Sequence, residues 1–412
     1  MLRSDALGAF RISGYRWLLL NSLGLTSSWT LETLATGWLA LELTNSPFWL
    51  GVVVGVRGLS QFVSSIVGGA FADRFDLRRV LVTNHLISAA IALTLFALAR
   101  SGTIQVWHLV AAGVVNGALG AIDGPSQQAL TFQIVGPKWI LNARSFHFMA
   151  AGLMRILAAI AGGLLIQQLG VAIPYLLLSG SLVAAALALL PLHSIPRQAR
   201  AAERPLSALA SGFRYARGAR LVRELLLLSL VTEAFAFSYQ AILPAIARDV
   251  LGVDALGLGQ LVAVGAAGQL AGTILLAALG DPRHKHLLLL GSSLGLGLAV
   301  LLLTVSPGFA VSLAVMVLIG ACSGGFDTLI ETVLQLAVHG DMRGRVLGLF
   351  VATWGFSGVA GFALGALATV VGSPVALALF ATLAIANSLR LVGRVSTIDP
   401  ARAGAEARVA TG

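Results

Sequence analysis

The sequence predicts an all-α membrane protein whose twelve transmembrane helices form two pseudo-symmetric halves of six. Three observations lead to this prediction: the composition, the spacing of the apolar stretches and the placement of the basic residues. Of the 412 residues, 57% are apolar and only 11% are charged, whereas about 25% are charged in an ordinary soluble domain. So little polar surface is not expected of a soluble enzyme, a nucleic-acid-binding protein or a disordered scaffold. The single cysteine, Cys322, excludes a disulfide framework within the chain.

Long apolar stretches, separated by short polar connectors, follow one another along the chain. A membrane-spanning helix needs about 20 apolar residues, and every stretch is longer than a buried strand. None shows the alternation of apolar and polar residues that is typical of an outer-membrane barrel. The predicted spans are residues 17–42, 48–71, 79–99, 104–125, 142–168, 171–192, 222–246, 256–279, 286–305, 309–333, 345–370 and 373–393.

The lysine and arginine residues are distributed unevenly between the connectors. If the N-terminus is cytoplasmic, nearly all of the 27 basic residues lie in inner segments. Only Arg100 and Arg248 fall in outer segments, and Arg57 and Arg155 lie within spans. Since the number of spans is even, both termini are predicted to be cytoplasmic, in a multi-pass protein of the inner (plasma) membrane. The first span is too long to be the apolar region of a cleaved signal peptide.

The longest polar stretch divides the chain into two halves. The division gives an N-terminal half of residues 1–195, a cytoplasmic linker of residues 196–221, a C-terminal half of residues 222–395 and a cytoplasmic tail of residues 396–412. The linker mixes arginines with apolar residues, which suits a helix lying on the anionic cytoplasmic leaflet. The alternative is a solvated linker that simply follows the positive-inside distribution.

The two halves resemble each other weakly but in register. Matched positions are Glu32 and Glu233 at an offset of 201, Gln61 and Gln269 at 208, and Gly163 and Gly365 at 202. In folds built from two such halves, the substrate site lies near the bilayer midplane between them.

The residues between the second and third spans carry the strongest motif. Residues 69–79 read Gly-Ala-Phe-Ala-Asp-Arg-Phe-Asp-Leu-Arg-Arg and resemble the G-x-x-x-D-R-x-G-R-R loop of the major facilitator superfamily, with Asp76 where glycine is usual. Residues 341–348, Asp-Met-Arg-Gly-Arg-Val-Leu-Gly, resemble the R-G-R-V segment of the branch that contains the enterobactin exporter and related multidrug efflux proteins. One departure lies in the fifth span, where the antiporter pattern G-P-x-x-G-G reads Ala-Ala-Ile-Ala-Gly-Gly at residues 158–163.

The resemblance implies the fold of that superfamily and a secondary-active transporter that works by alternating access. It implies export of an amphipathic small molecule, such as a siderophore or a drug, with proton antiport as the coupling. The alternative within transport is a lysophospholipid or metabolite carrier that acts as an importer or uniporter. A membrane enzyme or a receptor is the alternative of another class, but the sequence offers neither a converging nucleophile and base nor a sizeable soluble module.

The expected partners are a small-molecule substrate, protons and the lipid bilayer, without nucleic acid, and the expected state is a monomer. No cofactor or metal is expected. The seven histidines show no metal-ligand spacing, and the chain contains no Walker loop for ATP-driven pumping.

Ionisable residues inside the spans mark the candidate sites, because each costs about 2.5–3.5 kcal/mol on insertion scales. Glu32 and Arg57 lie at matched depths, roughly 13–15 Å below the outer surface. They are candidates for a substrate or proton site, and the alternative is an ion pair that holds the first two spans together. Glu233 has no obvious cation in the neighbouring spans and is a candidate proton-coupling carboxylate. The alternative for Glu233 is a neutral acid bonded to a backbone carbonyl or to Gln269.

Asp327 and Glu331 are four residues apart on the tenth span and therefore share one face of that helix. They lie toward its cytoplasmic end, where a cationic substrate or Arg343 could meet them. We consider three interpretations: a gate, a substrate contact and a solvated helix end.

The resemblance also implies a cytoplasmic gate around the loop after the second span. The loop aspartate would lie at the positive N-terminus of the eleventh span in one conformation. The acid at the end of the fourth span matches the one that often pairs with the loop arginine. The alternative is a set of positive-inside arginines with incidental acids. The gate residues are Gly69, Asp73, Arg74, Arg78, Asp123, Arg343 and Arg345.

Overall fold

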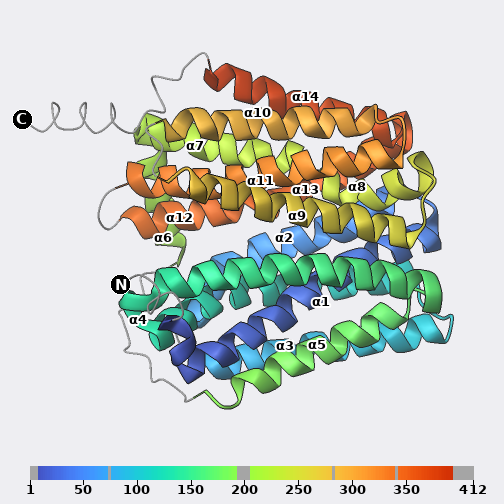
Figure 1. The fold of residues 1–412 in the computed structure, drawn as a ribbon, viewed down its shortest axis with the longest axis horizontal. Coiled ribbons are helices and arrows are strands. Elements are labelled where there is room, and N and C mark those ends of the chain that lie inside the picture. The colour runs from blue at the N-terminus through green and yellow to red at the C-terminus, as the bar shows by residue number, and fades with distance from the viewer. Residues whose placement is uncertain (1–7, 73–75, 193–204, 281–283, 339–341, 393–412) are drawn as a thin grey trace, which may run out of the picture. The chain divides into compact units, whose positions relative to one another are not determined.

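The computed structural model describes residues 8–72, 76–192, 205–280, 284–338 and 342–392. These residues are helical almost throughout, and none of them belongs to a strand (Figure 1). The chain divides into two compact units. Unit 1 is Met1–Asn45, Ser60–Ala202 and Val253–Ala263, and unit 2 is Ser46–Leu59, Glu203–Gly252 and Val264–Gly412.

Unit 1 contains a short 3₁₀ turn at Gly8–Arg11 and the helices α1 (Ser13–Thr44), α3 (Leu77–Arg100), α4 (Val106–Leu169) and α5 (Ile173–Leu189). Helix α1 packs against both α4 and α5, and α3 packs against α5. The fourth and fifth predicted spans both fall within α4, which consists of two helices that meet at a kink. A kink divides α4 at Gly136, whose φ of 70° lies in the region that favours glycine, and Pro137 follows directly.

Unit 2 contains the seventh predicted span as three pieces, because π-helical turns interrupt the regular helix. The chain passes from α7 (Arg220–Val231) through the π-turn η2 (Thr232–Ala236) and α8 (Tyr239–Ala245) to a second π-turn at Ile246–Val250. The remaining helices are α10 (Lys285–Thr304), α11 (Phe309–Ala337), α12 (Met342–Thr353), α13 (Gly355–Val371) and α14 (Ser373–Val392). Helices α12 and α13 together form the eleventh predicted span.

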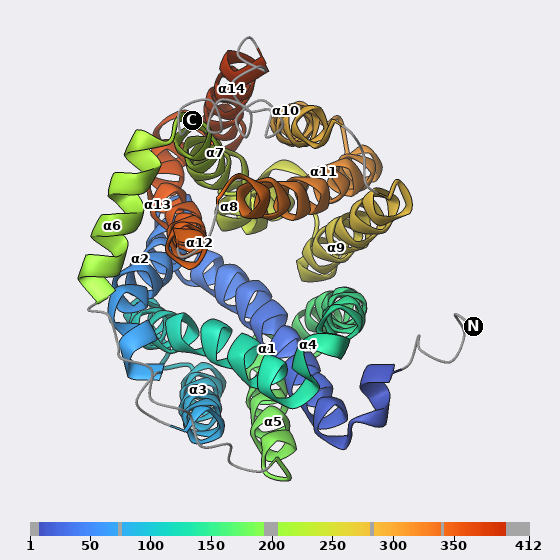
Figure 2. The ribbon, with the colours of Figure 1, turned by 90° about the vertical axis from the view of Figure 1, so that its left-hand side faces the viewer.

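The linker is helical where the structure describes it. Helix α6 (Pro205–Gly218) runs beside α12, as Figure 2 shows, with Gly212 against the backbone of Arg345. Its residue Ala216 joins a buried apolar cluster around Phe326 and Leu225, whereas Phe213 remains 63% exposed. Arg214 and Arg217 are exposed as well, and a basic helix with an exposed aromatic side chain is expected at an anionic membrane surface.

Two further helices are shared between the units. Helix α2 (Pro47–Ala72) begins in unit 2 and α9 (Ala255–Ala278) begins in unit 1, and each continues into the other unit. The predicted division at the linker stays a prediction.

Glycines explain why the beginnings of α2 and α9 pack where they do. In unit 1, a methyl group placed on Gly163 of α4 would lie 2.6 Å from the carbonyl oxygen of Ala255 and 3.1 Å from Cα of Gly259. In unit 2, a methyl group on Gly365 of α13 would lie 2.6 Å from the carbonyl oxygen of Pro47 and 2.9 Å from Cα of Gly51. Both pairs of backbones meet in the close approach that only small residues allow, and the contacts are equivalent in the internal repeat.

The predicted all-α fold is confirmed. Nine helices of the described residues are long and apolar enough to cross a membrane, and one of them, α4, contains two predicted spans. Helix α1 and the shorter apolar helix α5 complete the twelve. The chain is a multi-pass membrane protein.

Candidate functional site

In unit 1, one amide side chain joins Glu32 to two other helices. The Nδ2 atom of Asn116 on α4 donates a hydrogen bond to Oε1 of Glu32 on α1, at 2.7 Å. The hydroxyl of Ser88 on α3 donates to Oδ1 of Asn116, at 3.1 Å. The predicted carboxylate is thus half-buried and hydrogen-bonded within a polar link between three helices.

A second polar cluster in unit 1 surrounds Asp123 of α4. Asn84 Nδ2 on α3 donates to Asp123 Oδ1 at 2.8 Å, and His85 Nε2 lies 4.0 Å from Asp123 Oδ2. On the other side of the imidazole ring, Asn21 Nδ2 on α1 lies 3.4 Å from His85 Nδ1. Gln127 Nε2 donates to Asn21 Oδ1 at 2.6 Å. Four helices contribute to this cluster, since Asn21 also donates to the carbonyl oxygen of Ala185 on α5, at 2.9 Å.

The gate residue Arg78 lies beside an N-cap at the start of α3. The Asp76 carboxylate accepts a hydrogen bond from the backbone N–H of Arg78 at 3.0 Å, which explains why aspartate is acceptable where the superfamily motif has glycine. Arg78 Nε donates to the carbonyl oxygen of Leu189 at 3.0 Å, and Nη2 donates to that of Leu190 at 2.5 Å. The guanidinium group therefore satisfies the last carbonyl groups of α5.

Of the other predicted gate residues, the structure describes some and not others. Gly69 lies in the last turns of α2, and Asp73 and Arg74 lie outside the described residues. At the start of α12, Arg343 Nε donates to the carbonyl oxygen of Val338 at 3.3 Å. Arg345 Nη1 contacts the sulfur of Met342 at 3.6 Å. Both contacts are local to the connection between α11 and α12, and the gate function of all these residues stays a prediction.

In unit 2, Glu233 lies in the π-turn η2 and is only 6% exposed. The Asp327 carboxylate on α11 is close enough to interact with it electrostatically. Within the described part of the chain, the Glu233 carboxylate has no hydrogen bond or ion pair. Since π-turns inside helices are frequent at functional sites, this carboxylate is the strongest candidate in unit 2.

The other acidic candidates of unit 2 are held by glutamine side chains. Gln269 Nε2 on α9 donates to Asp327 Oδ2 at 3.3 Å, so Gln269 bonds Asp327 rather than Glu233. Gln335 Nε2 donates to Glu331 Oε1 at 2.9 Å, one turn further along α11. The structure therefore brings Glu233, Asp327 and Gln269 together, whereas Glu331 has a separate partner.

The predicted pairing of Glu32 with Arg57 remains a prediction, because Glu32 belongs to unit 1 and Arg57 to unit 2. Arg155, the other arginine inside a span, lies over the ring of Trp29 at 5.5 Å from its centroid. Trp29 and Arg155 belong to α1 and α4 of unit 1, so this cation–π contact links two helices of one unit.

Sequence reasoning missed two groups that the structure shows to be buried. Glu224 is 4% exposed and accepts from Arg390 Nη2 at 2.9 Å, joining α7 to α14. His85 is 1% exposed, although the histidines were judged only by metal-ligand spacing. The signal for His85 was present in the sequence, because Asn84 and His85 are adjacent polar residues inside an otherwise apolar span.

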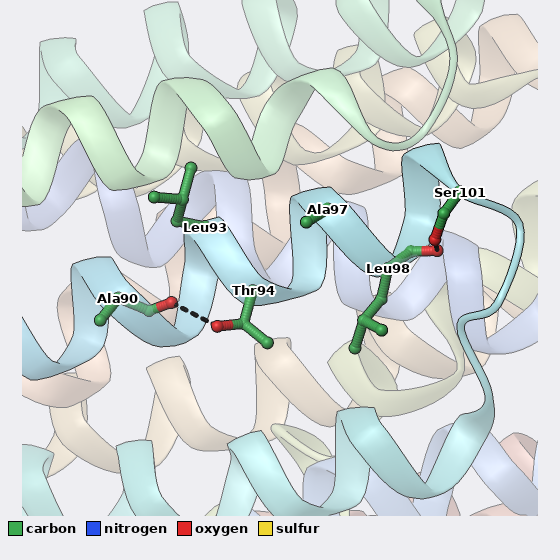
Figure 3. A pocket seen from close by; sticks show the side chains of 6 residues that line it. All are labelled: Ala90, Leu93, Thr94, Ala97, Leu98 and Ser101. Atoms are coloured by element: carbon green, nitrogen blue, oxygen red, sulfur yellow. Dashed lines mark hydrogen bonds between the residues drawn. The ribbon is translucent and has the colours of Figure 1, made fainter.

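A shallow pocket lies along α3, away from the candidate residues (Figure 3). Its only hydroxyl groups belong to Thr94, which donates to the carbonyl oxygen of Ala90 at 2.9 Å, and to Ser101, which donates to that of Leu98 at 3.0 Å. With its hydroxyl groups engaged in the helix, the pocket offers nothing to recognise a polar substrate. Among the described residues, no group of three or more His, Cys, Asp or Glu could hold a metal ion.

Comparison with known proteins relates nearly the whole chain to transporters. A family model described as "Transmembrane secretion effector" matches residues 4–408. The enterobactin exporter EntS of Escherichia coli O1:K1 / APEC is 30% identical over 327 residues, which cover 79% of this chain and 76% of the relative. The enterobactin exporter EntS of Shigella boydii serotype 18 (strain CDC 3083-94 / BS512) matches to the same extent.

Solved structures of other transporters share the fold at low sequence identity. The nucleoside transporter NupG superposes with a TM-score of 0.74 at 14% identity, covering 92% of this chain and 98% of that one. A POT family transporter in complex with 5-aminolevulinic acid gives a TM-score of 0.77 at 11% identity, covering 94% of this chain and 96% of the other. At these identities the likeness shows the fold alone.

Proposed function

We propose that this chain, which belongs to the transmembrane secretion effector family of the major facilitator superfamily, is a secondary-active exporter of an amphipathic small molecule. The observation that carries the proposal is the 30% identity to the enterobactin exporter over 79% of the chain. A siderophore is therefore the first substrate class to test, and drug-like amphiphiles are the second. The relatives are transporters rather than enzymes.

The exporter would work by alternating access to a site near the bilayer midplane. The distribution of basic residues supports cytoplasmic termini, and the motif at residues 69–79 supports a gate on the cytoplasmic side. Glu32 and Arg57 are the substrate candidates nearest the outer surface. Asp327 and Glu331 on α11 are the candidates nearest the inner one.

Proton antiport is the coupling that the acidic residues of unit 2 support. Glu233 is buried, it interacts with the nearby Asp327 carboxylate, and the described residues offer it no cation. Two carboxylates that lie close together within the membrane are stabilised when a proton or a positively charged group of the substrate is bound between them. Exchange of one for the other would couple export to proton entry.

The proposal is tested by a flux screen in proteoliposomes that contain the full chain. Siderophores, enterobactin first, and cationic amphiphiles are loaded, and export is compared with and without an imposed pH gradient. We expect one class to move against its gradient when the pH gradient is present. The Glu233→Gln variant should lose this response. The control variant Asp249→Asn should keep it, because the Asp249 carboxylate is exposed and bonds the neighbouring Arg248.

Other outcomes identify the alternatives. Movement of a substrate down its own gradient, unaffected by pH, would indicate a uniporter and remove proton coupling. Uptake of lysophospholipid without export of any amphiphile would support the importer. No movement of any tested class by the well-folded protein would contradict the proposed exporter.

A further inference from the structure

We propose that Trp29 on α1 and Arg155 on α4 form a binding site in unit 1 for an aromatic ring that carries an acidic group. The indole ring stacks on the aromatic ring of the ligand, and the guanidinium group binds its acidic group. The proposal rests on the proposed function, because it names the substrate class of the exporter. Its test, however, measures binding and does not require transport.

The contact between the two side chains is the first observation. The guanidinium carbon of Arg155 lies over the Trp29 ring, 5.5 Å from the ring centroid, which is within the range in which a cation is attracted to the face of an aromatic ring. A guanidinium group has several N–H donors in one plane, so it can hold an indole ring and an acidic group at the same time. The pair therefore presents a positive charge next to an aromatic surface.

Both residues lie near the middle of a membrane-spanning segment. Trp29 is the seventeenth of the 32 residues of α1. Arg155 lies 18 residues after Pro137 and 14 residues before Leu169, in the second of the two helices that make up α4. Tryptophan is usually found at the membrane interfaces, and an arginine at this depth is costly and usually functional. Folds built from two such halves also bind their substrates near the midplane.

Trp29 is exposed in a helix that is otherwise enclosed. Within residues 21–41 of α1, all of which the structure describes, it is the one exposed residue, with 44% of its surface open. Helix α5, by contrast, exposes a series of leucines that includes Leu176, Leu177 and Leu187, as expected of a helix that faces lipid. Trp29 does not belong to such a stripe, so the open part of its indole ring is available to a ligand.

The face of α1 that carries Trp29 is polar. Thr26 and Thr33 lie one turn away from it on either side, and Thr36 lies one turn beyond Thr33. All three threonines are half-buried, and the Thr36 hydroxyl lies 3.1 Å from that of Tyr175 on α5. Hydroxyl groups along one face of a span suit water or a polar ligand better than lipid chains.

The combination of the two side chains selects the class of ligand. An open indole ring gains most from a second aromatic ring, in a stacked or edge-on arrangement. Arg155 attracts a carboxylate or a phenolate and repels a cation. A neutral aromatic ring would use only the indole, whereas an aromatic acid uses both side chains.

Glu32 is the acidic residue of α1 closest to Trp29 along the chain, three residues further on. Its carboxylate accepts a hydrogen bond from Asn116, at 2.7 Å. Asn116 lies on the first of the two helices of α4, whereas Arg155 lies on the second. The negative and the positive charge are thus held by different helices, and the acidic group of the ligand belongs at Arg155.

Fluorine NMR of the full chain in nanodiscs tests the binding at one residue. The seven tryptophans are replaced by fluorotryptophan, and the Trp29→Phe variant identifies the ¹⁹F signal of Trp29. The probes are naphthoate, naphthamide and naphthylmethylamine, which share one ring system and differ in charge. We expect naphthoate to shift the Trp29 signal saturably, at concentrations at least about tenfold lower than naphthamide, because only the acid makes charge-assisted hydrogen bonds. Naphthylmethylamine should bind no more tightly than naphthamide.

Controls separate this site from probe dissolved in the bilayer. The signal of Trp107, which is 56% exposed at the start of α4, should show no saturable shift with any probe. Arg155→Gln should reduce the preference for naphthoate over naphthamide from about tenfold to about onefold. Arg155→Lys should keep part of the preference, because the charge remains while the planar set of N–H groups is lost. It also replaces Arg155→Gln if that variant does not fold.

Three results would overturn the proposal. The first is a Trp29 signal that no probe shifts saturably, or that all three shift at the same concentration. The second is tighter binding of naphthylmethylamine, which would assign the choice of ligand charge to Glu32. The third is an Arg155→Gln variant that keeps the preference of the parent. Selective naphthoate binding by a chain that moves no substrate class in the flux screen would contradict the proposed exporter but not this site, so the two failures are distinguishable.

Discussion

Amide side chains hold carboxylates in both units, but only unit 2 also has a buried carboxylate, that of Glu233, without a hydrogen bond or ion pair among the described residues. In unit 1, Asn116 and Asn84 fix the two carboxylates of Glu32 and Asp123. In unit 2, the Ser293 hydroxyl lies 3.1 Å from that of Thr232 and 2.8 Å from that of Ser388. This chain of hydroxyl groups joins η2, α10 and α14.

The two halves are alike in helix packing but differ in the contacts of their carboxylates. The contacts of Gly163 with α9 and of Gly365 with α2 have nearly the same distances: an added methyl group would lie 2.6 Å from a carbonyl oxygen in both. The carboxylates have no such correspondence: Glu32 accepts from an amide in unit 1, whereas its repeat partner Glu233 lies in a π-turn beside another acid. The close glycine contacts are therefore common to both units, whereas the partners of the buried carboxylates differ between them.

The largest loss of stability is expected from substitutions at the two glycine contacts that both units share. Gly163→Leu and Gly365→Leu should each destabilise the protein by about 3 kcal/mol or more, at the upper end for overpacked sites, because the added atoms meet backbone rather than flexible side chains. The measurement is the unfolding midpoint in detergent, together with the yield of inserted protein. Gly180→Leu is the control, since Gly180 of α5 has nothing within 4 Å of an added methyl group. A variant of one unit that behaves like the control would show that the two contacts are not equivalent.

A smaller effect is expected from the ion pair that holds Glu224 in unit 2. Arg390→Gln removes the nearer of two cations, 2.9 Å from a carboxylate whose side chain is 5% exposed, and leaves Arg223 Nη2 at 4.0 Å. Breaking a fully buried pair costs about 3–5 kcal/mol, and because Arg390 is 39% exposed we expect about 2 kcal/mol. Denaturant titration of the purified protein measures the loss. Arg248→Gln, in the more exposed pair with Asp249, should cost less than about 1 kcal/mol, and equal losses would contradict the assigned burial.

The corresponding change in unit 1 removes an amide rather than a cation. Asn116→Leu leaves Glu32 without its 2.7 Å hydrogen bond and should cost about 1–2 kcal/mol. Ser293→Ala in unit 2 interrupts only bonds between neutral hydroxyl groups and should cost about 1 kcal/mol or less. The same titration compares both variants. A larger loss of stability for Ser293→Ala than for Asn116→Leu would contradict this expectation.

The smallest effect is expected at the starts of the equivalent helices α3 and α10. Asp76 caps α3 through the backbone N–H of Arg78, whereas His284 at the start of α10 makes no side-chain cap bond. Asp76→Ala should therefore cost about 1 kcal/mol, and His284→Ala should cost almost nothing. Thermal unfolding followed by circular dichroism measures both. Losses of the same size would mean that the cap contributes nothing to stability.

The sequence was informative wherever a property is local or periodic. Apolar length predicted the helices, and an offset of 202 residues, close to that of other matched pairs, predicted that Gly163 and Gly365 are equivalent, because both signals depend only on spacing along the chain. The π-turn at Glu233 was not predicted, since one extra residue in a helical turn leaves the apolar pattern almost unchanged. The connector between the fourth and fifth predicted spans is helical on both sides of the kink at Gly136, which its polar composition did not indicate.

The contacts of the candidate residues were less predictable. Asp123 was expected to pair with a loop arginine, and Arg74 lies outside the described residues, whereas the structure places Asn84 and His85 beside Asp123. The neighbours of His85 come from α1 and α4: Asn21 is 64 residues away in the sequence and Asp123 is 38 residues away. No spacing rule connects residues so far apart in the sequence, so the neighbours of the imidazole are defined only once the helices have packed together.

Helices α2 and α9 are each divided between the two units, as segments are in a domain-swapped pair. Each half contributes the first turns of one helix to the other unit, with Ser46–Leu59 counted in unit 2 and Val253–Ala263 in unit 1. A half expressed alone would lack one segment of its own packing and would hold another without its partner, so the two halves should be stable only when they are made together.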